Sequence, residues 1–172
     1  LERHGATEFA YLGDAVGYVP SPDVVNSLMR LDRLILCIRG NHEDMLLKGD
    51  VQPKRDQVYQ LHVTKRLLSK SALEYLASWP VNRSIAFPAG GALFVHGSPS
   101  DPTNGYVYPS SDLSLYRTDA KFVFMGHSHH PFIRHHGETT YVNVGSCGMP
   151  RDDGRYGAAG LFEIRQYFTM CV

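Results

Sequence analysis

The sequence has no net charge, few cysteines and no long hydrophobic run. Its 172 residues include 17 basic and 17 acidic side chains, which cancel at neutral pH. A protein without excess positive charge has no overall attraction to nucleic acid or to an anionic membrane surface. No apolar stretch approaches the roughly 20 residues that a membrane-spanning helix needs. These absences argue against a nucleic-acid-binding nuclease module and against a membrane protein, although a local basic pocket remains compatible with them.

Cysteine is rare, and its pattern is uninformative for disulfides. Cys37, Cys147 and Cys171 are odd in number and widely spaced, and no Cys-x-x-Cys motif occurs. We therefore expect a reduced, cytoplasmic protein. Cys147 has no evident neighbouring base in the sequence, so we interpret it as a structural thiol and not as a nucleophile.

What is present is an alternation of short apolar strands with helical stretches, which predicts an α/β fold in a single domain. Residues 56–79 are predicted to form two helices, with Ser71 and Glu74 as a capping box. A further helix is predicted at 22–31. Strands are predicted at 9–12, 34–38, 83–87, 92–95, 122–125, 131–136, 140–144 and 158–164.

Several of these strands stop at a polar residue flanked by glycine. The residues concerned are Asp14, Asn41, His96, His127 and His129. In sheet proteins, ligands gather outside the carboxyl ends of strands, so these side chains could share one site. One carboxylate, one amide and three imidazoles suit a borderline divalent metal and do not suit calcium. Because a carboxylate can bridge two metals, Asp14 is the natural shared ligand.

A histidine directly follows one of these candidate ligands. His42 could donate a proton to a leaving group, since its side chain titrates near neutrality. Arg151 could contact a substrate phosphate, and a surface ion pair is an equal alternative. Tyr18, Tyr106 and Tyr108 could stack on a nucleobase, although packing in the core or at a rim is the simpler interpretation.

Four short motifs, taken in order, resemble those of the calcineurin-like metallophosphoesterases. They are Gly-Asp at 13–14, Gly-Asn-His-Glu at 40–43, His-Gly at 96–97 and Gly-His-Ser-His at 126–129. The segment Asn-Val-Gly-Ser-Cys-Gly-Met-Pro-Arg at 143–151 is similar to one found in the small bacterial and archaeal phosphodiesterase branch of that superfamily. The resemblance spans residues 13–151, nearly the whole chain.

The resemblance implies a four-layer α/β/β/α sandwich, with two mixed sheets flanked by helices. It also implies that Asp14 bridges two divalent transition-metal ions, with Mn²⁺ preferred and Fe, Ni, Co or Zn as alternatives. Asn41, His96 and His127 would hold one metal and His129 would help to hold the other. His42 would assist departure of the leaving group, with Arg151 and Tyr18 as candidate substrate-binding residues.

Two departures from the family pattern matter. The family opens with Asp-x-His, and no such motif precedes Asp14, so we expect residues 1–172 to be one metallophosphoesterase domain without its first strand and motif. Gly17-Tyr18 stands where the serine/threonine phosphatases carry Asp-Arg, which argues against a phosphoprotein phosphatase.

The sequence therefore predicts a metal-dependent phosphoesterase, in which water activated by two metals hydrolyses a phosphodiester, a phosphomonoester or a dinucleoside polyphosphate. The substrate would be a small phosphate ester, with a nucleotide as one option. The alternative is a non-catalytic scaffold on the same fold with an incomplete metal site. A homodimer is common for such folds, and no interface can be recognised in the sequence.

Overall fold

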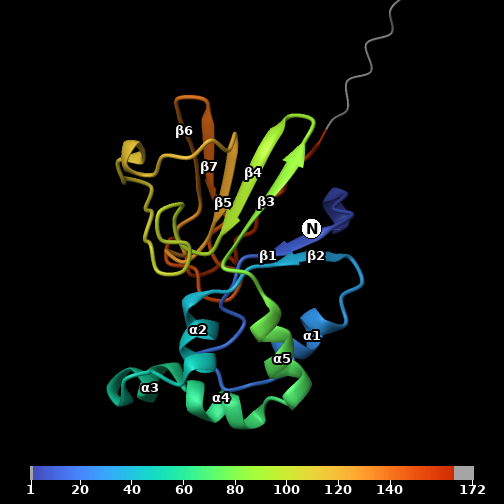
Figure 1. Cartoon of the computed structure of the whole chain (residues 1–172), viewed down its shortest axis with the longest axis vertical. Coiled ribbons are helices and arrows are strands. Elements are labelled where there is room, and N and C mark those ends of the chain that lie inside the picture. Colours follow the sequence, from blue (N-terminus) through green and yellow to red (C-terminus); the bar gives the residue numbers. More distant parts are fainter. Residues whose placement is uncertain (1, 165–172) are drawn as a thin grey trace, which may run out of the picture.

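The computed structural model describes residues 2–164, in which seven strands form two sheets accompanied by five α-helices (Figure 1). The strands are β1 (Phe9–Tyr11), β2 (Leu34–Cys37), β3 (Asn82–Phe87), β4 (Gly90–Val95), β5 (Phe122–Met125), β6 (Phe132–His136) and β7 (Thr139–Asn143). The α-helices are α1 (Asp23–Met29), α2 (Asn41–Lys48), α3 (Pro53–Tyr59), α4 (Leu61–Leu67) and α5 (Lys70–Ser78). Two 3-10 helices are η1 (Glu2–His4) and η2 (Leu113–Leu115).

The strand directions bring several chain segments to a common edge. The small sheet pairs β1 with β2 in parallel. The second sheet has the order β3-β4-β5-β7-β6, with β4, β5 and β7 parallel to one another and an antiparallel hairpin at each end. Because parallel strands finish at the same edge of a sheet, the segments that follow β4, β5 and β7 emerge together. This arrangement decides where the polar residues after those strands lie.

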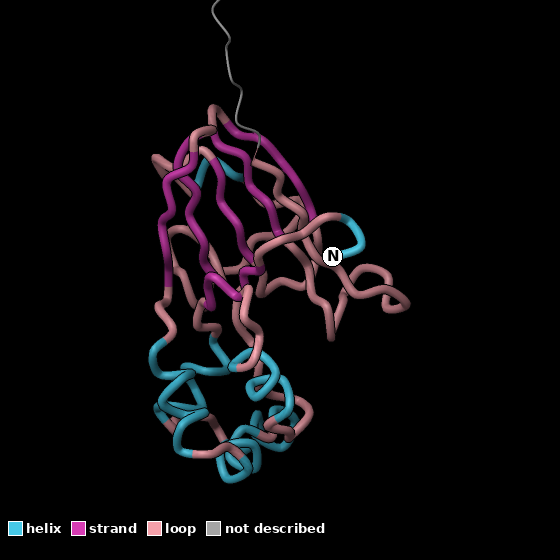
Figure 2. Tube along the Cα trace, turned by 90° about the vertical axis from the view of Figure 1, so that its right-hand side faces the viewer, coloured by secondary structure: helices cyan, strands magenta, loops and turns pink. Residues whose placement is uncertain are grey.

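Three clusters of buried side chains hold four layers together. Val25, Leu46 and Leu76 pack the helices against the small sheet. Ile38 of the segment after β2 and Phe94 of β4 lie in the cluster between the two sheets. A third cluster covers the far face of the five-stranded sheet, where the outer layer is the segment 97–120 with η2 in place of an α-helix. The predicted fold class is confirmed, and Figure 2 shows the helices gathered at one end and the strands above them.

The prediction of two helices in residues 56–79 was wrong. The structure has three, because Gln60 adopts a left-handed backbone conformation (φ 55°) between α3 and α4. The carboxylate of Asp56 accepts hydrogen bonds from the backbone N–H groups of Leu61 and His62, which fixes the break. The predicted capping box was also misplaced, since Ser69 is the N-cap of α5 and accepts from the Ala72 backbone N–H at 3.1 Å.

Two further predictions about secondary structure need correction. Residues 158–164 form no strand: Ala158 donates one backbone hydrogen bond to Ser146, and Phe162 packs its ring into the cluster between the sheets without a strand ladder. The segment that begins at Asn41 was interpreted only as the end of a strand, whereas it is the first turn of α2. Cys171 lies outside the described residues, and Cys37 and Cys147 are both free thiols.

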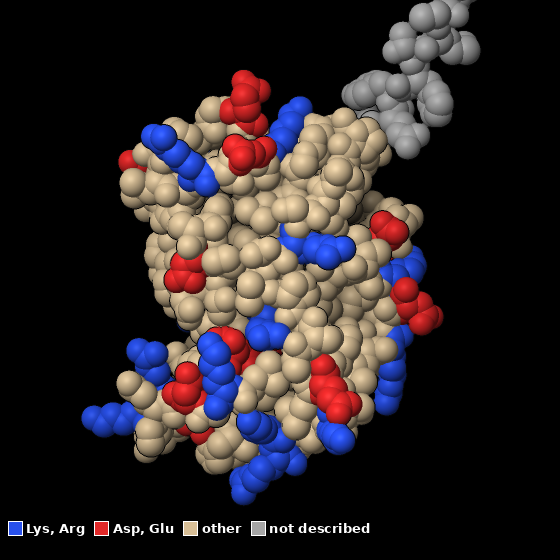
Figure 3. Space-filling view, in the orientation of Figure 1, with Lys and Arg blue, Asp and Glu red and all other residues tan. Residues whose placement is uncertain are grey.

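The visible surface carries charges of both signs. Figure 3 shows Lys and Arg interspersed with Asp and Glu, most densely over the helical end of the molecule, with no large area of one sign on that face. Within residues 2–164, no helix combines the length and apolarity needed to cross a bilayer. The mixed surface agrees with the balanced charge of the sequence.

We predict that the contact between the two sheets carries a large share of the stability. Phe124 of β5 is 7% exposed and stacks on Phe94 with ring centroids 5.0 Å apart. Phe124→Ala should lower the free energy of unfolding by about 3–5 kcal/mol, because it leaves a cavity between the layers. Urea denaturation would measure this change. Ile133→Ala on β6, at a residue that is 69% exposed, should cost less than about 0.5 kcal/mol, and equal effects of the two substitutions would contradict the layer assignment.

Candidate metal centre

The ends of four strands deliver polar side chains to one place. Asp14 follows β1, Asn41 follows β2, His96 follows β4 and His127 follows β5. His96 and His127 are buried, and Asp14 is partly buried. The structure therefore brings these four strand ends together.

Three candidate metal-ligand atoms lie close to the Nε2 atom of His96. This nitrogen lies 3.3 Å from Oδ2 of Asp14, 3.2 Å from Oδ1 of Asn41 and 3.0 Å from Nδ1 of His127. Ligand atoms of Asp14, His96 and His127 all lie within 4.8 Å of one another, and they are the one group of at least three His, Cys, Asp or Glu side chains so arranged within residues 2–164. Four atoms that each carry a lone pair thus converge on one small region.

The orientation of His96 is fixed by its other ring nitrogen. Nδ1 donates a hydrogen bond of 2.6 Å to the backbone carbonyl of Leu12. A histidine that ligates a metal in proteins almost always donates its second N–H to a carbonyl or carboxylate in this way. The bond to Leu12 turns the Nε2 lone pair toward the other three donors.

The electrostatics of the cluster favour a positive charge at its centre. Burial alone would lower the pKa of His96, but the carboxylate of Asp14 outweighs it and raises that pKa. Burial likewise opposes the charge on Asp14, yet the nearby His96 lowers the pKa of this carboxyl. Burial, reinforced by the charge on His96, lowers the pKa of His127 to about 4, so this ring is neutral at physiological pH. The carboxylate of Asp14 thus favours positive charge on the ring of His96, while the ring of His127 is held neutral.

The backbone at these residues is unusual. Asp14, His127 and His129 all have positive φ values near 60°, which non-glycine residues rarely adopt. A hydrogen bond of 2.6 Å from the Ser128 N–H to the Gly126 carbonyl closes a three-residue turn centred on His127. Turns of this kind are rare and strained, and such strain clusters at functional sites.

A buried amide supports that strained turn. Asn143, at the end of β7, donates from Nδ2 to the carbonyl of Gly126 at 2.7 Å and to Oγ of Ser128 at 3.0 Å. Its own Oδ1 accepts from the Gly145 N–H. The sequence indicated Asn143 only as part of a motif resemblance, and its role in holding the loop around His127 comes from the structure.

Sequence reasoning missed a second supporting residue, Glu43, which is fully buried. Its carboxylate accepts backbone hydrogen bonds from Asp14 and Gly40 at 2.8 Å each and from Val16 at 3.2 Å. Burial and the charge on Asp14 raise the pKa of Glu43 to about 7. A Cβ atom on Gly40 would lie 2.2 Å from Oδ1 of Asp14, so this close approach of the two loops requires glycine. Glu43 therefore ties the loop after β1 to the start of α2.

His42 lies beside the cluster under two tyrosines. Its backbone N–H donates to Oδ1 of Asp14 at 3.1 Å, and its ring stacks against Tyr18 and packs against Tyr59. The side chain is 4% exposed, burial lowers its pKa, and its Nδ1 atom has no hydrogen-bond partner within residues 2–164. A Cβ on Gly17 would lie 2.1 Å from that nitrogen, so glycine is required beneath the ring.

The remaining predicted site residues flank the cluster. His129 is outside the converging group; its Nδ1 donates to the Met149 carbonyl at 2.7 Å, and partial burial lowers its pKa. Arg151 donates its backbone N–H to the His129 carbonyl at 3.1 Å. Within residues 2–164 its guanidinium makes no ion pair, and its charge acts on His42 and His129.

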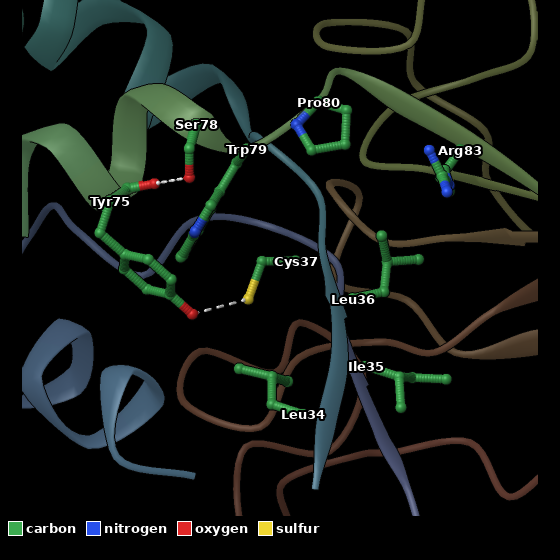
Figure 4. Close-up of a pocket in the computed structure, with 9 residues that line it drawn as sticks. All are labelled: Leu34, Ile35, Leu36, Cys37, Tyr75, Ser78, Trp79, Pro80 and Arg83. Atoms are coloured by element: carbon green, nitrogen blue, oxygen red, sulfur yellow. Dashed lines mark hydrogen bonds between the residues drawn. The ribbon is translucent and has the colours of Figure 1, made fainter. Parts of the chain in front are cut away.

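A separate pocket of about 320 Å³ lies beside the edge of β2 and contains none of these groups (Figure 4). Figure 4 shows Cys37 hydrogen-bonded to the hydroxyl of Tyr75, with Trp79 and Arg83 at the rim. The residues that line this pocket therefore offer no convergent set of metal ligands.

The donor set fits a borderline divalent metal ion. One carboxylate oxygen, one amide oxygen and two neutral imidazole nitrogens are the mixture such ions accept. The hydrogen bond from His96 to Leu12 supplies the outer support that metal-binding histidines need. Asp14, Asn41, His96 and His127 could therefore hold one metal ion.

We predict that the Glu43 carboxylate stabilises the fold through the three backbone groups that it accepts. Glu43→Ala should lower the free energy of unfolding by about 3 kcal/mol or more, since it leaves buried N–H groups without partners. Glu74→Ala, which removes an exposed carboxylate near Lys70, should cost less than about 0.5 kcal/mol. Urea denaturation compares the two variants, and a Glu43→Ala cost as small as that of Glu74→Ala would refute this role.

Comparisons with known proteins agree with this geometry. A sequence model of the calcineurin-like phosphoesterase superfamily domain matches residues 1–166. A metallophosphoesterase from Sphaerobacter thermophilus is 26% identical, with a TM-score of 0.70 over 84% of this chain and 68% of that chain.

Two less characterised proteins are also similar. A hypothetical protein from Pyrococcus horikoshii shares the fold, with 20% identity, a TM-score of 0.71 and coverage of 87% of this chain and 68% of that one. An uncharacterized protein from Methanocaldococcus jannaschii is 25% identical over 187 residues, which cover 97% of this chain and 75% of that protein. With the family match over nearly its whole length, this chain belongs to the calcineurin-like phosphoesterase superfamily.

Proposed function

We propose that this protein hydrolyses a phosphate ester with the help of two divalent transition-metal ions, Mn²⁺ being the preferred ion. The observation that carries the proposal is the convergence of Asp14, Asn41 and His127 on Nε2 of His96. These four side chains would hold one metal. Asp14 and His129 would contribute to the second, since His129 follows His127 by two residues and the charge on Asp14 acts on its ring.

When bound, divalent ions at such a site supply Lewis acidity toward phosphate oxygens and make water acidic enough to act as a nucleophile near neutral pH. The chain's own residues determine how the ester lies. Arg151 has a charged side chain without an ion-pair partner within residues 2–164, and a planar guanidinium is well suited to bind two phosphate oxygens. We propose that Arg151 orients the phosphate, with Tyr18, which stacks on His42, as a further substrate contact.

His42 is proposed to protonate the leaving-group oxygen. Its Nδ1 atom has no partner within residues 2–164, and Tyr18 and Tyr59 hold the ring in a fixed orientation. The neighbouring Asp14 carboxylate favours the protonated ring, which opposes the effect of burial on its pKa. A general acid held in this way contributes most when the leaving group is a poor one.

The same proposal includes the domain organisation and the class of substrate. We propose that the described residues act as one domain and that the substrate is a small ester, either a monoester, a diester or a dinucleoside polyphosphate. Mixed surface charge on the visible face supports a small substrate over a nucleic acid (Figure 3). A cytoplasmic location and a homodimer are carried forward from the sequence as expectations.

We predict that Mn²⁺-loaded protein hydrolyses bis-p-nitrophenyl phosphate and that His96→Ala reduces turnover by at least about 100-fold, because it removes a proposed ligand at the centre of the cluster. Release of p-nitrophenolate measures the rate. His135→Ala is the matched control, since this exposed histidine contacts only Thr140 through its ring within the described residues, and its activity should equal that of the parent. A parent protein inactive with Mn²⁺, Fe²⁺, Co²⁺, Ni²⁺ and Zn²⁺ would favour the scaffold alternative.

We predict that His42→Gln slows hydrolysis in proportion to the basicity of the leaving group. For a diester with an alkoxide leaving group, turnover should fall about 100-fold or more, which is typical of a lost general acid. For a p-nitrophenyl ester, whose leaving group needs little protonation, the loss should be at least tenfold smaller. Turnover numbers of both substrates test this. An equal loss on both would indicate that His42 only positions other groups.

A further inference from the structure

Two exposed tyrosines stack on each other beside the candidate metal centre. Tyr106 and Tyr108 lie on the segment that follows β4, and their ring planes differ by only 5° with centroids 5.7 Å apart. Tyr106 is 46% exposed and Tyr108 is 38% exposed. We call this pair the aromatic wall. Figure 1 shows the yellow segment to which it belongs beside the five-stranded sheet and above α2.

The aromatic wall directly adjoins a proposed metal ligand. The ring of Tyr106 lies 4.0 Å from the ring of His127, centroid to centroid. Tyr108 contacts the ring of His130 edge-on at 5.6 Å. A substrate whose phosphate lies at His127 would therefore bring the group attached to that phosphate within reach of the two tyrosines.

The backbone of the aromatic wall is fixed before any ligand binds. Val107, between the two tyrosines, is 1% exposed and belongs to the cluster on the outer face of the sheet, so its neighbours point the other way. The hydroxyl of Tyr116 donates to the Tyr106 carbonyl at 3.0 Å, and the Tyr108 N–H donates to Oγ of Ser111 at 2.9 Å. Arg134 donates to the carbonyls of Pro109 and Ser111. Such preorganisation reduces the entropy lost on binding.

The two rings pack on each other and on His127 and His130, yet both remain partly exposed to solvent. The sequence alone left rim or core packing as the simpler interpretation, but Val107 is the side chain that fills the core here. Neither tyrosine hydroxyl has a hydrogen-bond partner within residues 2–164. Large aromatic side chains held rigid and exposed next to a site are the usual means of holding a planar ring by stacking.

We propose that the aromatic wall binds a planar aromatic group of the substrate, so that the ester hydrolysed here is a nucleotide or another phosphate ester that carries such a ring. This inference rests on the proposed phosphate site at the metal centre. The wall itself is uncharged. The backbone N–H of Arg151 donates to the carbonyl of His129, two residues after His127, so Arg151 lies next to the same cluster. A ring on the tyrosines and a phosphate between Arg151 and His127 together match the two ends of a nucleoside monophosphate.

Calorimetric titration of the Mn²⁺-loaded protein tests this through binding, with each ligand analysed after the titration to confirm that it has not been hydrolysed. The ligands are adenosine 5′-monophosphate, phenyl phosphate and ribose 5-phosphate, which share a phosphate and differ in the ring that they carry. Adenosine monophosphate should bind at least about tenfold more tightly than ribose 5-phosphate, as base stacking on aromatic side chains provides. If phenyl phosphate also binds more tightly than ribose 5-phosphate, the aromatic wall binds aromatic rings in general. If phenyl phosphate binds as weakly as ribose 5-phosphate, the aromatic wall is specific for nucleobases.

Variants separate stacking from other causes. Tyr108→Leu should reduce the preference for adenosine monophosphate over ribose 5-phosphate, and Tyr106→Leu combined with Tyr108→Leu should abolish it. The affinity for ribose 5-phosphate should stay within about twofold, because the phosphate contacts remain. Tyr108→Phe should retain the preference, since the ring is kept. Tyr156→Leu is the matched control, as this tyrosine is 67% exposed and contacts Arg155.

The outcomes distinguish this inference from the proposed function. Equal binding of adenosine monophosphate and ribose 5-phosphate by the parent protein would overturn the aromatic wall while leaving the phosphate site intact. A preference that survives in the double variant would also overturn it. If none of the three ligands binds to the loaded protein, the phosphate site itself is wrong, and the inference falls with it. Fluorescence of Trp79, which is buried among the helices, reports whether each variant is folded.

Discussion

The structure of this protein is organised around the point where four candidate metal-ligand atoms meet. Asp14, Asn41 and His127 all approach Nε2 of His96 within 3.3 Å. Oxygen and nitrogen atoms buried this close together need a proton or a metal ion among them to offset the repulsion of their lone pairs. A proton can serve this purpose, as the raised pKa of His96 indicates, but the donor set is that of a divalent metal ion.

The fold is arranged so that this meeting point is rigid. Parallel strands from two sheets end at one edge, and left-handed backbone conformations at Asp14 and His127 aim the side chains into it. Two buried side chains then hold these strained loops: Glu43 binds the backbone on the side of the small sheet, and Asn143 does so on the side of the large one. Hydrogen bonds from these two residues, which are not themselves candidate ligands, offset the strain of the loops. Metal sites in proteins are commonly supported in this way.

The sequence indicated which polar residues follow the strand ends, but not what holds those residues in place. Short apolar runs that end in Gly-Asp or Gly-His are local signals, so the strand ends and their polar residues could be recognised. Glu43 could not, because it acts on the backbone of a segment 27 to 29 residues away. The break at Gln60 depends on a carboxylate cap from Asp56, and the residues around Phe162 are apolar without forming a strand. Burial of His42 beneath Tyr59 is likewise a tertiary effect that no spacing in the sequence reveals.

The most direct test of this account is anomalous X-ray diffraction from crystals soaked in Mn²⁺, with data collected at the manganese absorption edge. The account predicts an anomalous peak within bonding distance of Asp14, Asn41, His96 and His127, and a second peak near Asp14 and His129. A map with no peak at the four converging donors, or with manganese bound only elsewhere on the molecule, would contradict it.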